Sequence, residues 1–562
     1  MIGQNYEGIQ YILILSSFKC ALNLSFVTGF LGYGITTPVD TKKLKDNMRG
    51  CLDYDFMVDG FTTGFALGVR ADYDLVRGKT RLNPAPLKLV EKLEEEVMKG
   101  RIIGPFDETP VADLHISPLH VIPKADSEKV RMIFNLSHPP KGSVNENIDE
   151  EMRSVSYCSV QDVGDCLQAR YLPGQVWMAK VDLADAYRIV PVRVDDWKFL
   201  GICVNGKYYI DRMLPMGAAS SCKIFQRISD SLREMFIRRK PVEVDVFNYL
   251  DDFLFVASSQ TGCNQSLKEF EAMCQELGVP VASQKTVVAS QVITFLGLGI
   301  NGKDFTLFIP EEKRRKVQDK LTQFLNESAP RVKKWQSIAG SLNHIAQVIS
   351  SGRVYLGSVY SSMAGILSQD GNRRRRVSAE TRLDLGVWFA LLDSPPERAF
   401  LLFNPDVSLC PPLYTDASTG VGFGAVWGDQ WFYGQWPAGK SHNIAVLELY
   451  PIVLAIHMLD QDVRDTALRV FTDNAALVSV LNRLYSRDAL LRRLLRPLVS
   501  ICLQRNLRIC ASHVAGSENV APDLLSRGKI AEFKSRFPTL AATPMNIPET
   551  LSPVGSGWLV WD

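Results

Sequence analysis

The chain has 562 residues, of which 46% are hydrophobic and 22% are charged, and its formal net charge is +2. This composition excludes a disordered or low-complexity protein, and the length predicts three or four domains rather than one. The eleven cysteines include no C-x-x-C pair, which argues against a zinc knuckle or a redox motif and favours a reduced, intracellular protein.

The first 83 residues are expected to form an N-terminal extension of uncertain role. Residues Ile9–Leu15 are apolar, but Glu7 precedes them and Lys19 interrupts the run. The run is far shorter than the ~20 residues needed to cross a bilayer. We therefore predict no signal peptide, no transmembrane segment and no membrane partner, with a cytoplasmic or nuclear location.

From residue 84 onward, helical and strand patterns alternate as in a mixed α/β domain. A charged helix is predicted over Lys88–Lys99, ahead of Gly104-Pro105. Segments rich in β-branched and aromatic residues predict strands. They are Leu119–Ile122, Arg131–Asn135, Val176–Leu183, Phe199–Val204 and Lys207–Leu214.

Amphipathic helices are predicted next, over Glu311–Asn326, Val332–Ile349 and Ala379–Leu392. Between Pro310 and Arg376 there are 13 Lys and Arg against 5 Asp and Glu, a local charge of +8. Such an excess attracts phosphate backbones, although a solvated basic face is the simpler alternative. The run Arg373–Arg376 also resembles a nuclear-import signal, for which four arginines alone are weak support.

Two proline pairs, at 395–396 and 411–412, lead into a second α/β unit that extends to about Gly528. Beyond it, residues 531–562 are rich in Pro, Ser and Thr and are expected to be a linker-like tail.

Two adjacent acids, Asp251 and Asp252, lie inside the apolar, β-prone segment Asn248–Val256. The pattern predicts a hairpin with carboxylates at its turn, where burial of two charges requires compensation, usually by a divalent metal. Upstream, a predicted strand ends at Asp182, and the chain turns through Asp185-Ala186-Tyr187. Three carboxylates at neighbouring strand ends can hold two magnesium ions.

A second set of acids follows strands or lies in helices between residues 413 and 528. In chain order the residues are Asp416, Glu448, Asp473, His513 and Asp523, the pattern D…E…D…H-x9-D. Asp523 alone would be explained as a helix cap, but the ordered set predicts a second two-metal site.

The Y-L-D-D sequence at Tyr249–Asp252 resembles the Y-x-D-D box of reverse transcriptases, and Val181–Tyr187 resembles their first catalytic motif. The resemblance implies that Asp182, Asp251 and Asp252 are ligands of two Mg²⁺ ions, with Mn²⁺ as an alternative. One ion would activate the primer 3′-hydroxyl and the other would neutralise the leaving pyrophosphate. Tyr187 falls at the position of an aromatic gate that excludes a 2′-hydroxyl, with an ordinary core tyrosine as the alternative.

Further motifs of this family follow in the family's order. Ser117–Lys124 with Val130–Asn135 resembles the fingers hairpin, which implies that Lys124 and Arg131 contact the triphosphate, although either alone reads as a surface base. Leu214–Gly217 resembles the template- and nucleotide-binding box, with Met216 where retroviral enzymes carry Gln. Lys285 falls where a basic residue protonates pyrophosphate, and Phe295–Gly299 resembles the primer grip.

The second set of acids resembles ribonuclease H. The resemblance implies that Asp416, Glu448, Asp473 and Asp523 are ligands of two Mg²⁺ ions. It also implies that His513 is a mobile base or product-release group, a role that suits its near-neutral pKa.

The expected fold is therefore a multidomain one of the α/β and α+β classes. A right-hand polymerase would place fingers and palm at residues 84–305 and a helical thumb or connection at 306–400. A ribonuclease H-like mixed five-stranded sheet with helices would follow at 410–530.

The implied function is RNA-directed DNA polymerisation with ribonuclease H activity on RNA–DNA hybrids, serving retrotransposon replication. The implied partners are an RNA template, a DNA primer, RNA–DNA hybrid and dNTPs, and other retroelement proteins such as a recombinase or a capsid-like protein. Phe61–Gly68, Ile338–Asn343 and Leu524–Gly528 look most like DIRS-type retrotransposons, which encode a tyrosine recombinase.

Two alternatives remain. A decayed or co-opted protein would only bind nucleic acid, but all seven acidic positions are intact, which favours an active enzyme. A pararetrovirus-type polymerase is the other alternative.

Overall fold

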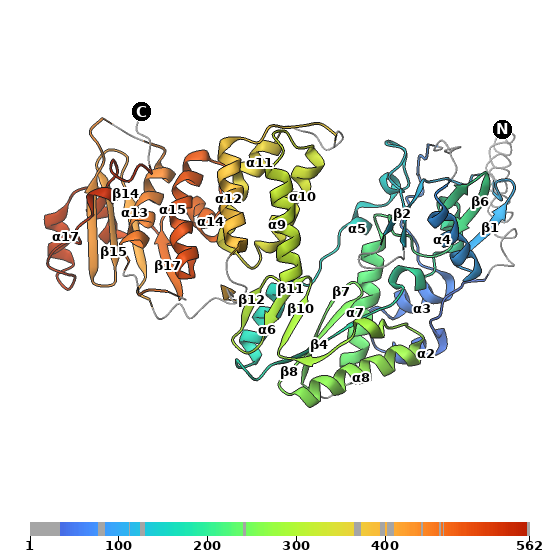
Figure 1. The fold of residues 1–562 in the computed structure, drawn as a ribbon. Helices are drawn as coiled ribbons and strands as arrows, with labels where there is room; N and C mark the ends of the chain where they lie inside the picture. The colour runs from blue at the N-terminus through green and yellow to red at the C-terminus, as the bar shows by residue number, and fades with distance from the viewer. Residues whose placement is uncertain are drawn as a thin grey trace, which may run out of the picture. The chain divides into compact units, whose positions relative to one another are not determined.

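The computed structural model describes residues 34–558, apart from 77–84, 112, 124–129, 240–242, 365–371, 394–399, 402–409, 440–441, 460–461 and 465. The chain divides into two compact units (Figure 1). The first comprises residues up to Val163 together with Gln175–Gln291, and the second comprises Gly164–Gly174 together with the residues from Val292 onward. The apolar run at Ile9–Leu15 lies outside the described residues.

The first unit combines short helices with three antiparallel sheets. Its helices are α2 (Thr41–Asn47), α3 (Tyr54–Thr63), α4 (Leu87–Met98), η1 (Asn145–Asn147), α5 (Glu150–Arg153), η2 (Ala186–Ile189), η3 (Val194–Phe199), α7 (Ser221–Arg239), α8 (Gln260–Leu277) and η4 (Ser283–Lys285). Its strands are β1 (Ile102–Phe106), β2 (Leu119–Pro123), β3 (Val130–Phe134), β4 (Trp177–Asp182), β5 (Gly201–Val204), β6 (Lys207–Asp211), β7 (Val244–Tyr249), β8 (Asp252–Ala257) and β9 (Val287–Ser290). Helix α6 (Val160–Arg170) begins in this unit and ends in the other.

The central sheet of the first unit has the strand order β7-β8-β4-β9. Strand β8 is buried along almost its whole length, which explains why its sequence is continuously apolar rather than alternating. Helix α8 packs on β4 and β8, and α7 packs on β7. Between them, Phe236, Phe253, Phe255 and Phe270 form an aromatic core with ring centroids 4.7–5.6 Å apart. The strand ends that carry the acids are therefore supported by a packed aromatic core.

The described part of the N-terminal extension belongs to the core of the first unit. Phe61, Phe65 and Leu67 are buried there. The Phe65 amide donates to the Pro191 carbonyl at 2.9 Å, and the Leu67 amide donates to the Asp196 carboxylate at 2.7 Å. Residues 34–76 therefore support the chain that follows Tyr187 rather than forming a separate domain.

The second unit begins with a small sheet and a group of helices. The sheet has the order β10-β11-β12-β13, formed by β10 (Val292–Phe295), β11 (Leu298–Asn301), β12 (Thr306–Phe308) and β13 (Phe400–Leu401). The helices are α9 (Glu311–Leu325), α10 (Val332–Ile345), η5 (Ser350–Leu356), α11 (Gly357–Met363) and α12 (Ala379–Asp393). The second of the two compact units includes this small sheet from Val292 onward. Its strand β12 pairs with β13, which follows the helices in the chain.

The rest of the second unit is a five-stranded mixed sheet of order β16-β15-β14-β17-β18 with helices on both faces. Its strands are β14 (Leu413–Ala417), β15 (Gly422–Trp427), β16 (Gln430–Gln435), β17 (Thr466–Thr472) and β18 (Leu507–His513). Its helices are α13 (Ile444–Met458), α14 (Ala475–Arg483), α15 (Ala489–Arg505), α16 (Val520–Ser526), α17 (Ile530–Arg536) and η6 (Glu549–Leu551). Strands β14, β17 and β18 are parallel to one another, and β15 and β16 are antiparallel to their neighbours.

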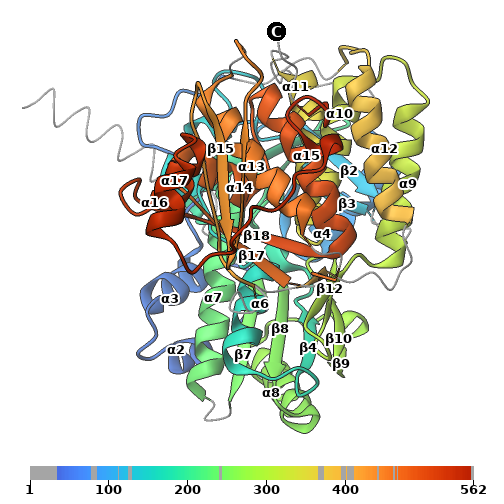
Figure 2. The same cartoon turned by 90° about the vertical axis from the view of Figure 1, so that its left-hand side faces the viewer.

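Adjacent residues of β15 show that the sheet is covered on both faces. The Phe423 ring packs on Tyr450 of α13, whereas a Cβ at Gly424 would meet Leu525 of α16 at 2.3 Å. Successive strand residues point to opposite faces, so α13 and α16 cover opposite faces, as Figure 2 shows. The expected fold class, a mixed α/β protein with a five-stranded sheet in its C-terminal part, is confirmed.

The C-terminal segment differs from the expected linker. Phe533 of α17 is buried against Trp431, with ring centroids 4.8 Å apart. The Met545 amide donates to the Trp431 carbonyl at 2.8 Å, and the Tyr450 hydroxyl donates to the Leu551 carbonyl at 2.6 Å. A few aromatic contacts without helical or strand periodicity hold the tail on the sheet, so a pattern search misses them. Among the described helices, none is both long enough and apolar enough to cross a membrane.

Candidate active sites

The turn between β7 and β8 carries the two adjacent acids, as the sequence predicts. Tyr249 pairs with Asp252, leaving Leu250 and Asp251 in the turn. Leu250 adopts a left-handed conformation with φ of 51°, which is costly for a branched residue. Helix α7 holds it there, because Gln226 accepts from the Leu250 amide at 2.9 Å and Ser229 donates to the Leu250 carbonyl at 2.7 Å.

Asp182 meets this turn from the neighbouring strand. In the β4–β8 register Asp182 lies directly opposite Asp252, so their Cβ atoms are about 5 Å apart. The Leu183 amide also donates to the Asp251 carbonyl at 2.9 Å. The structure therefore brings together the three acids that the sequence assigned to the first site.

Two lysines lie beside these carboxylates. Lys285 of η4 donates from Nζ to Asp182 Oδ2 at 2.6 Å, and Lys180 Nζ lies 3.6 Å from Asp252 Oδ1. Burial, together with the negative charge of Asp182, raises the pKa of Asp251 to about 6. Burial also raises the pKa of Asp252, while Lys180 opposes that shift. The site therefore concentrates more negative charge than its two lysines neutralise.

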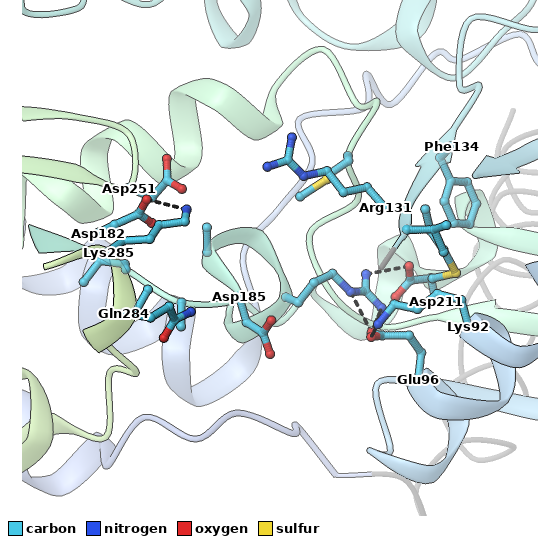
Figure 3. Close-up of a pocket in the computed structure, with 18 residues that line it drawn as sticks. Lys92, Glu96, Arg131, Phe134, Asp182, Asp185, Asp211, Asp251, Gln284 and Lys285 are labelled. Atoms are coloured by element: carbon cyan, nitrogen blue, oxygen red, sulfur yellow. Dashed lines mark hydrogen bonds and ion pairs between the residues drawn. The ribbon is translucent and has the colours of Figure 1, made fainter. Parts of the chain in front are cut away.

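A cavity of about 260 Å³ opens beside these acids. Figure 3 places Asp182 and Asp251 at one end of it and Asp211 at the other. Arg131 of β3 and Met216 also line the cavity. Both were assigned to nucleotide binding from the sequence, and the structure places both on the same cavity as Asp182 and Asp251. Lys124 lies outside the described residues.

Tyr187 of η2 is half-buried next to the first site. Its ring centroid lies 5.1 Å from that of Phe225, and its hydroxyl donates to Cys222 Sγ at 3.4 Å. Helix α7, which carries both partners, thus holds one side of the tyrosine. These contacts fix the ring and are compatible with both the gate and the ordinary core role.

Sequence reasoning missed a buried ionic cluster at the far end of the cavity. Arg188 forms ion pairs with Glu96 and Asp211, and all three side chains line the cavity. The only signal in the sequence was the position of Arg188 directly after Tyr187, because its partners lie 92 and 23 residues away.

The second set of acids gathers on the five-stranded sheet. Asp416 lies on the central strand β14, and Asp473 follows the neighbouring strand β17. Glu448 lies on α13 and Asp523 on α16. Asp473 and Asp523 raise the pKa of Asp416, and Asp473 and Asp416 raise the pKa of Glu448, as neighbouring carboxylates do.

Neighbouring polar groups orient these acids. The Ser526 hydroxyl donates to Asp416 Oδ2, and the Asn519 side-chain amide donates to the Thr415 carbonyl at 2.9 Å. Asn474 caps α14 by accepting from the amides of residues 476 and 477, which fixes the chain directly after Asp473. Ser526 lies in the Leu524–Gly528 motif and Asn474 directly follows Asp473, but neither position indicates in the sequence which acid or amide its side chain contacts.

Among the acids of the second site, Glu448 has the carboxyl pKa that is shifted most. Burial, opposed by the Asn474 side chain and reinforced by Asp473 and Asp416, raises its pKa to about 7. Burial also raises the pKa of Asp416. His513 is exposed at the end of β18, with Nε2 3.1 Å from the Asp473 carbonyl oxygen. Asp523 is ion-paired with Arg527 at 2.7 Å.

Both carboxylate groups have the donor chemistry of a divalent-cation site. Glu448 Oε2 and Asp473 Oδ1 are buried and receive no hydrogen bond, which is costly unless a cation or a proton compensates. Asp252 Oδ1 receives no hydrogen bond either, but Lys180 Nζ lies 3.6 Å away. The oxygens are hard ligands that suit Mg²⁺. As the side chains lie, no three His, Cys, Asp or Glu residues in the described ranges are arranged to hold one ion, so binding would require Lys285 and the carboxylates to rotate.

Comparison with known proteins bears on the first unit. Residues 122–300 match the model of the reverse transcriptase (RNA-dependent DNA polymerase) family. The match includes Asp182, Asp251 and Asp252. The chain therefore contains a reverse transcriptase domain over these residues.

Curated relatives are viral polyproteins. The chain is 24% identical over 230 residues to the Gag-Pol polyprotein of avian reticuloendotheliosis virus, which covers 40% of this chain and 19% of that protein. It is 25% identical over 183 residues to a putative enzymatic polyprotein of cassava vein mosaic virus, covering 33% and 25%. The chain thus matches a quarter or less of the length of these relatives.

Solved structures give a more distant likeness. A foamy viral protease–reverse transcriptase in complex with RNA/DNA hybrid aligns over 78% of this chain and 56% of that chain, with 15% identity and a TM-score of 0.45. The same viral protein in complex with double-stranded DNA aligns over 79% and 87%, with 16% identity and a TM-score of 0.43.

Proposed function

We propose that the chain is an RNA-directed DNA polymerase that carries a ribonuclease H activity in its second unit. The observation that carries the proposal is the first carboxylate site. Asp182 lies opposite Asp252 at the ends of paired strands, and Asp251 lies in the adjoining turn. All three are within the segment that matches the reverse transcriptase family.

The site is proposed to hold two Mg²⁺ ions, or Mn²⁺, through Asp182, Asp251 and Asp252. Bound there, such ions would lower the pKa of a primer 3′-hydroxyl and neutralise the charge on the leaving pyrophosphate. The chain's own residues complete the site. Arg131 supplies a forked cation to the cavity that a dNTP would enter. Lys285, released from Asp182, carries a proton within reach of the leaving group.

Ribonuclease H activity is assigned to the acids on the five-stranded sheet. Asp416, Glu448, Asp473 and Asp523 supply oxygen ligands only, and two of their oxygens are buried without a partner. The exposed His513 lies at the edge of this group, where it can take up a proton from water or release one to the product. The proposed substrate is the RNA strand of an RNA–DNA hybrid.

The wider biological setting is part of the proposal. We assign the chain to a retrotransposon of the DIRS type on the sequences Phe61–Gly68, Ile338–Asn343 and Leu524–Gly528. RNA template, DNA primer, hybrid and dNTPs are the proposed ligands, and a recombinase or capsid-like protein of the same element is a proposed partner.

One assay tests both activities. A labelled DNA primer annealed to a labelled RNA template is incubated with the full chain, dNTPs and Mg²⁺. Primer extension together with RNA shortening is expected, and both should stop in excess EDTA. Extension in EDTA would overturn the metal assignment, and an unshortened template beside an extended primer would overturn the ribonuclease H assignment.

A further inference from the structure

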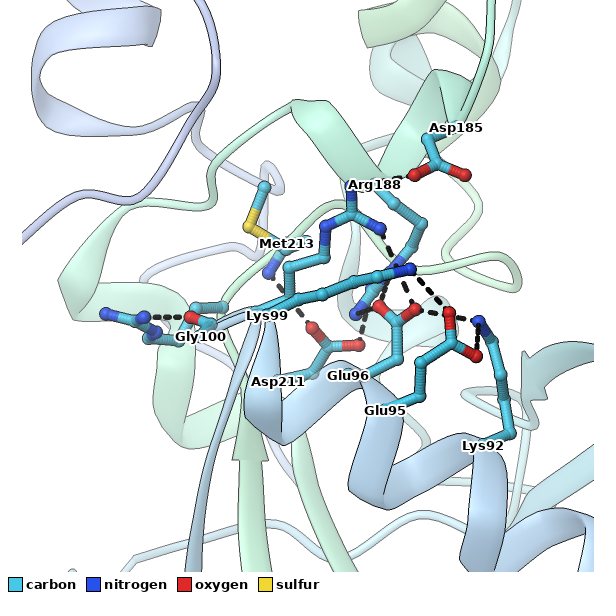
Figure 4. A network of polar contacts seen from close by, with 11 residues as sticks. Lys92, Glu95, Glu96, Lys99, Gly100, Asp185, Arg188, Asp211 and Met213 are labelled. Carbon is cyan, nitrogen blue, oxygen red and sulfur yellow. Dashed lines mark hydrogen bonds and ion pairs between the residues drawn. The ribbon is translucent and has the colours of Figure 1, made fainter.

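The proposed gate residue, Tyr187, lies between Asp185 and Arg188 in the chain. The side chains of both form ion pairs with residues at the C-terminal end of α4. Asp185 precedes it and forms an ion pair with Arg101 at 2.8 Å. Arg188 follows it, and its Nε and Nη2 lie 3.0 and 2.9 Å from Glu96 Oε2. Glu96 lies in the last turn of α4 and Arg101 lies three residues after the helix ends. Figure 4 shows Arg188 together with Glu96 and Asp211.

Arg188 has a second anchor on β6. Its Nη1 lies 2.7 Å from Asp211 Oδ2. The other oxygen of Asp211 accepts from the Met213 amide at 3.0 Å, directly ahead of the box that contains Met216. Glu96 and Asp211 are buried, at 1% and 0% exposure, so solvent screens these contacts little. One guanidinium therefore ties the gate turn to two other segments that line the cavity.

The backbone conformation of the turn suits it to being positioned by these ion pairs. Asp185 adopts a left-handed conformation with φ of 54°, which Asp tolerates better than most residues but which still costs conformational energy. The 3₁₀ turn that follows is a single turn, too short to hold its own geometry. Helix α7 holds the Tyr187 ring, and the ion pairs of Asp185 and Arg188 attach the backbone of the turn to the end of α4.

We propose that the end of α4 positions the nucleotide gate, with Arg188 as the main positioning residue acting through Tyr187. This inference rests on the proposed polymerase function. Glu96, Arg101 and Asp211 hold the turn from residue 185 to residue 188, and the turn sets the distance between the Tyr187 ring and the sugar of the incoming nucleotide. The cluster thereby contributes to the choice of dNTP over rNTP by fixing the position of the Tyr187 ring.

The cluster could instead only stabilise the fold. A variant that removes all three charges of the cluster distinguishes this structural role from the positioning role. Arg188→Met alone leaves the buried Asp211 carboxylate without a cation, and it removes one of the cations around Glu96, which keeps Lys92 at 3.0 Å. This variant is expected to be unstable. The triple variant Arg188→Met, Glu96→Gln, Asp211→Asn removes those charges and should recover most of the thermal stability. If the cluster only stabilised the fold, the triple variant would also recover wild-type kinetics.

The measurement is single-nucleotide incorporation by the full chain with dNTP and with rNTP. For the triple variant we expect an apparent KM for dNTP raised about tenfold or more, a smaller change in kcat, and a lower dNTP/rNTP selectivity, since a displacement of about 1 Å suffices for effects of this size. Arg188→Lys keeps the charge but loses the fork, and should show the same KM effect more weakly. Arg193→Met, the same change at an exposed position five residues on, is the matched control.

A double-mutant cycle tests whether Arg188 acts through Tyr187. If it does, adding Arg188→Lys to Tyr187→Ala should lower selectivity no further than Tyr187→Ala alone. Additive losses, or wild-type KM and selectivity in both Arg188→Lys and the triple variant, would overturn the proposal. A wild-type chain that extends no primer would instead overturn the proposed function.

Discussion

The two carboxylate sites have the same kind of ligands but balance their charge differently. In the first unit, Lys285 contacts Asp182 at 2.6 Å and Lys180 lies 3.6 Å from Asp252. In the second, Asp416 receives only a hydroxyl hydrogen bond, from Ser526. Among the residues described, no Lys or Arg forms an ion pair with Asp416, Glu448 or Asp473.

The pKa values of the two sites follow this difference. Burial raises the pKa of Asp251 to about 6 and that of Glu448 to about 7. Two lysines partly neutralise the first site. In the second site Arg527 is ion-paired with Asp523, and the other three acids depend on a proton or a cation from solution. The first site should therefore respond to changes in its lysines, and the second to pH and metal.

The largest expected effect is the separate loss of the two activities. Asp251→Asn keeps the size of the side chain and removes a metal-binding charge, so primer extension should fall about 1,000-fold or more. Cleavage of a preformed RNA–DNA hybrid should persist. Asp473→Asn should give the converse result.

Each of these variants is the control for the other, with hybrid affinity measured at fixed salt because phosphate contacts dominate affinity. Loss of hybrid cleavage in Asp251→Asn, with affinity and folding intact, would contradict two independent sites.

Removal of the lysine at the first site should have the next largest effect. Lys285→Gln removes both a proton donor and the cation that competes with metal for Asp182. Incorporation at saturating Mg²⁺ should fall about 100-fold, while the Mg²⁺ concentration for half-maximal rate should decrease. Titration of Mg²⁺ in primer extension measures both quantities, with Lys268→Gln, an exposed lysine on α8, as the control. An unchanged Mg²⁺ requirement would show that Lys285 does not compete with the metal.

Local features of both sites could be predicted from the sequence alone. The hairpin at Asp251 follows from apolar flanks around two acids, and the helix expected at Glu311–Asn326 spans Glu311–Leu325. Such local patterns can be predicted because they depend on the burial and periodicity of residues that are neighbours in the sequence. The five-stranded sheet was likewise expected, but as what the resemblance of the second set of acids to ribonuclease H implies.

The contacts that tune the sites could not be predicted. Lys285 and Asp182 are 103 residues apart, and Arg188 and Glu96 are 92 apart. A basic residue in a sequence shows its charge but not its partner. The α10 pattern, expected to Ile349, ends at Ile345, because apolar residues beyond it are buried in a different backbone geometry. Periodicity alone does not distinguish the two.

Tyr187→Ala tests whether the first site also selects its substrate. Removal of the ring leaves Phe225 without its partner and opens space near the cavity. Selectivity for dNTP over rNTP should fall at least about tenfold, with dNTP incorporation changed much less. Tyr187→Phe loses only the hydroxyl bond to Cys222 and should retain selectivity. Competition between a dNTP and its rNTP in primer extension gives the ratio, and equal ratios in all three proteins would assign Tyr187 to the core.

The smallest effect should be a pH-dependent change in stability at the second site. Because the pKa of Glu448 is raised from 4.5 to about 7 on folding, the folded state binds a proton more tightly than the unfolded state. Its ionisation therefore destabilises the metal-free protein as pH rises from about 4.5 through 7. Glu448→Gln removes this penalty, so in EDTA the variant should exceed wild type in stability by on the order of 2 kcal/mol at pH 8, with little difference at pH 4.5.

Calorimetric unfolding of the full chain at several pH values measures this gap, with Glu518→Gln, an exposed position in the same unit, as the control. Mg²⁺ should make wild type the more stable protein at pH 8. The cation binds the ionised Glu448 of wild type, whereas the variant lacks this ligand. Asp251→Asn should show the same behaviour with a smaller amplitude, since the pKa of Asp251 rises only to about 6 and Lys285 lies nearby. A gap independent of pH, or unaffected by Mg²⁺, would mean that Glu448 is compensated by the protein itself and that the two sites do not differ in the way their charges imply.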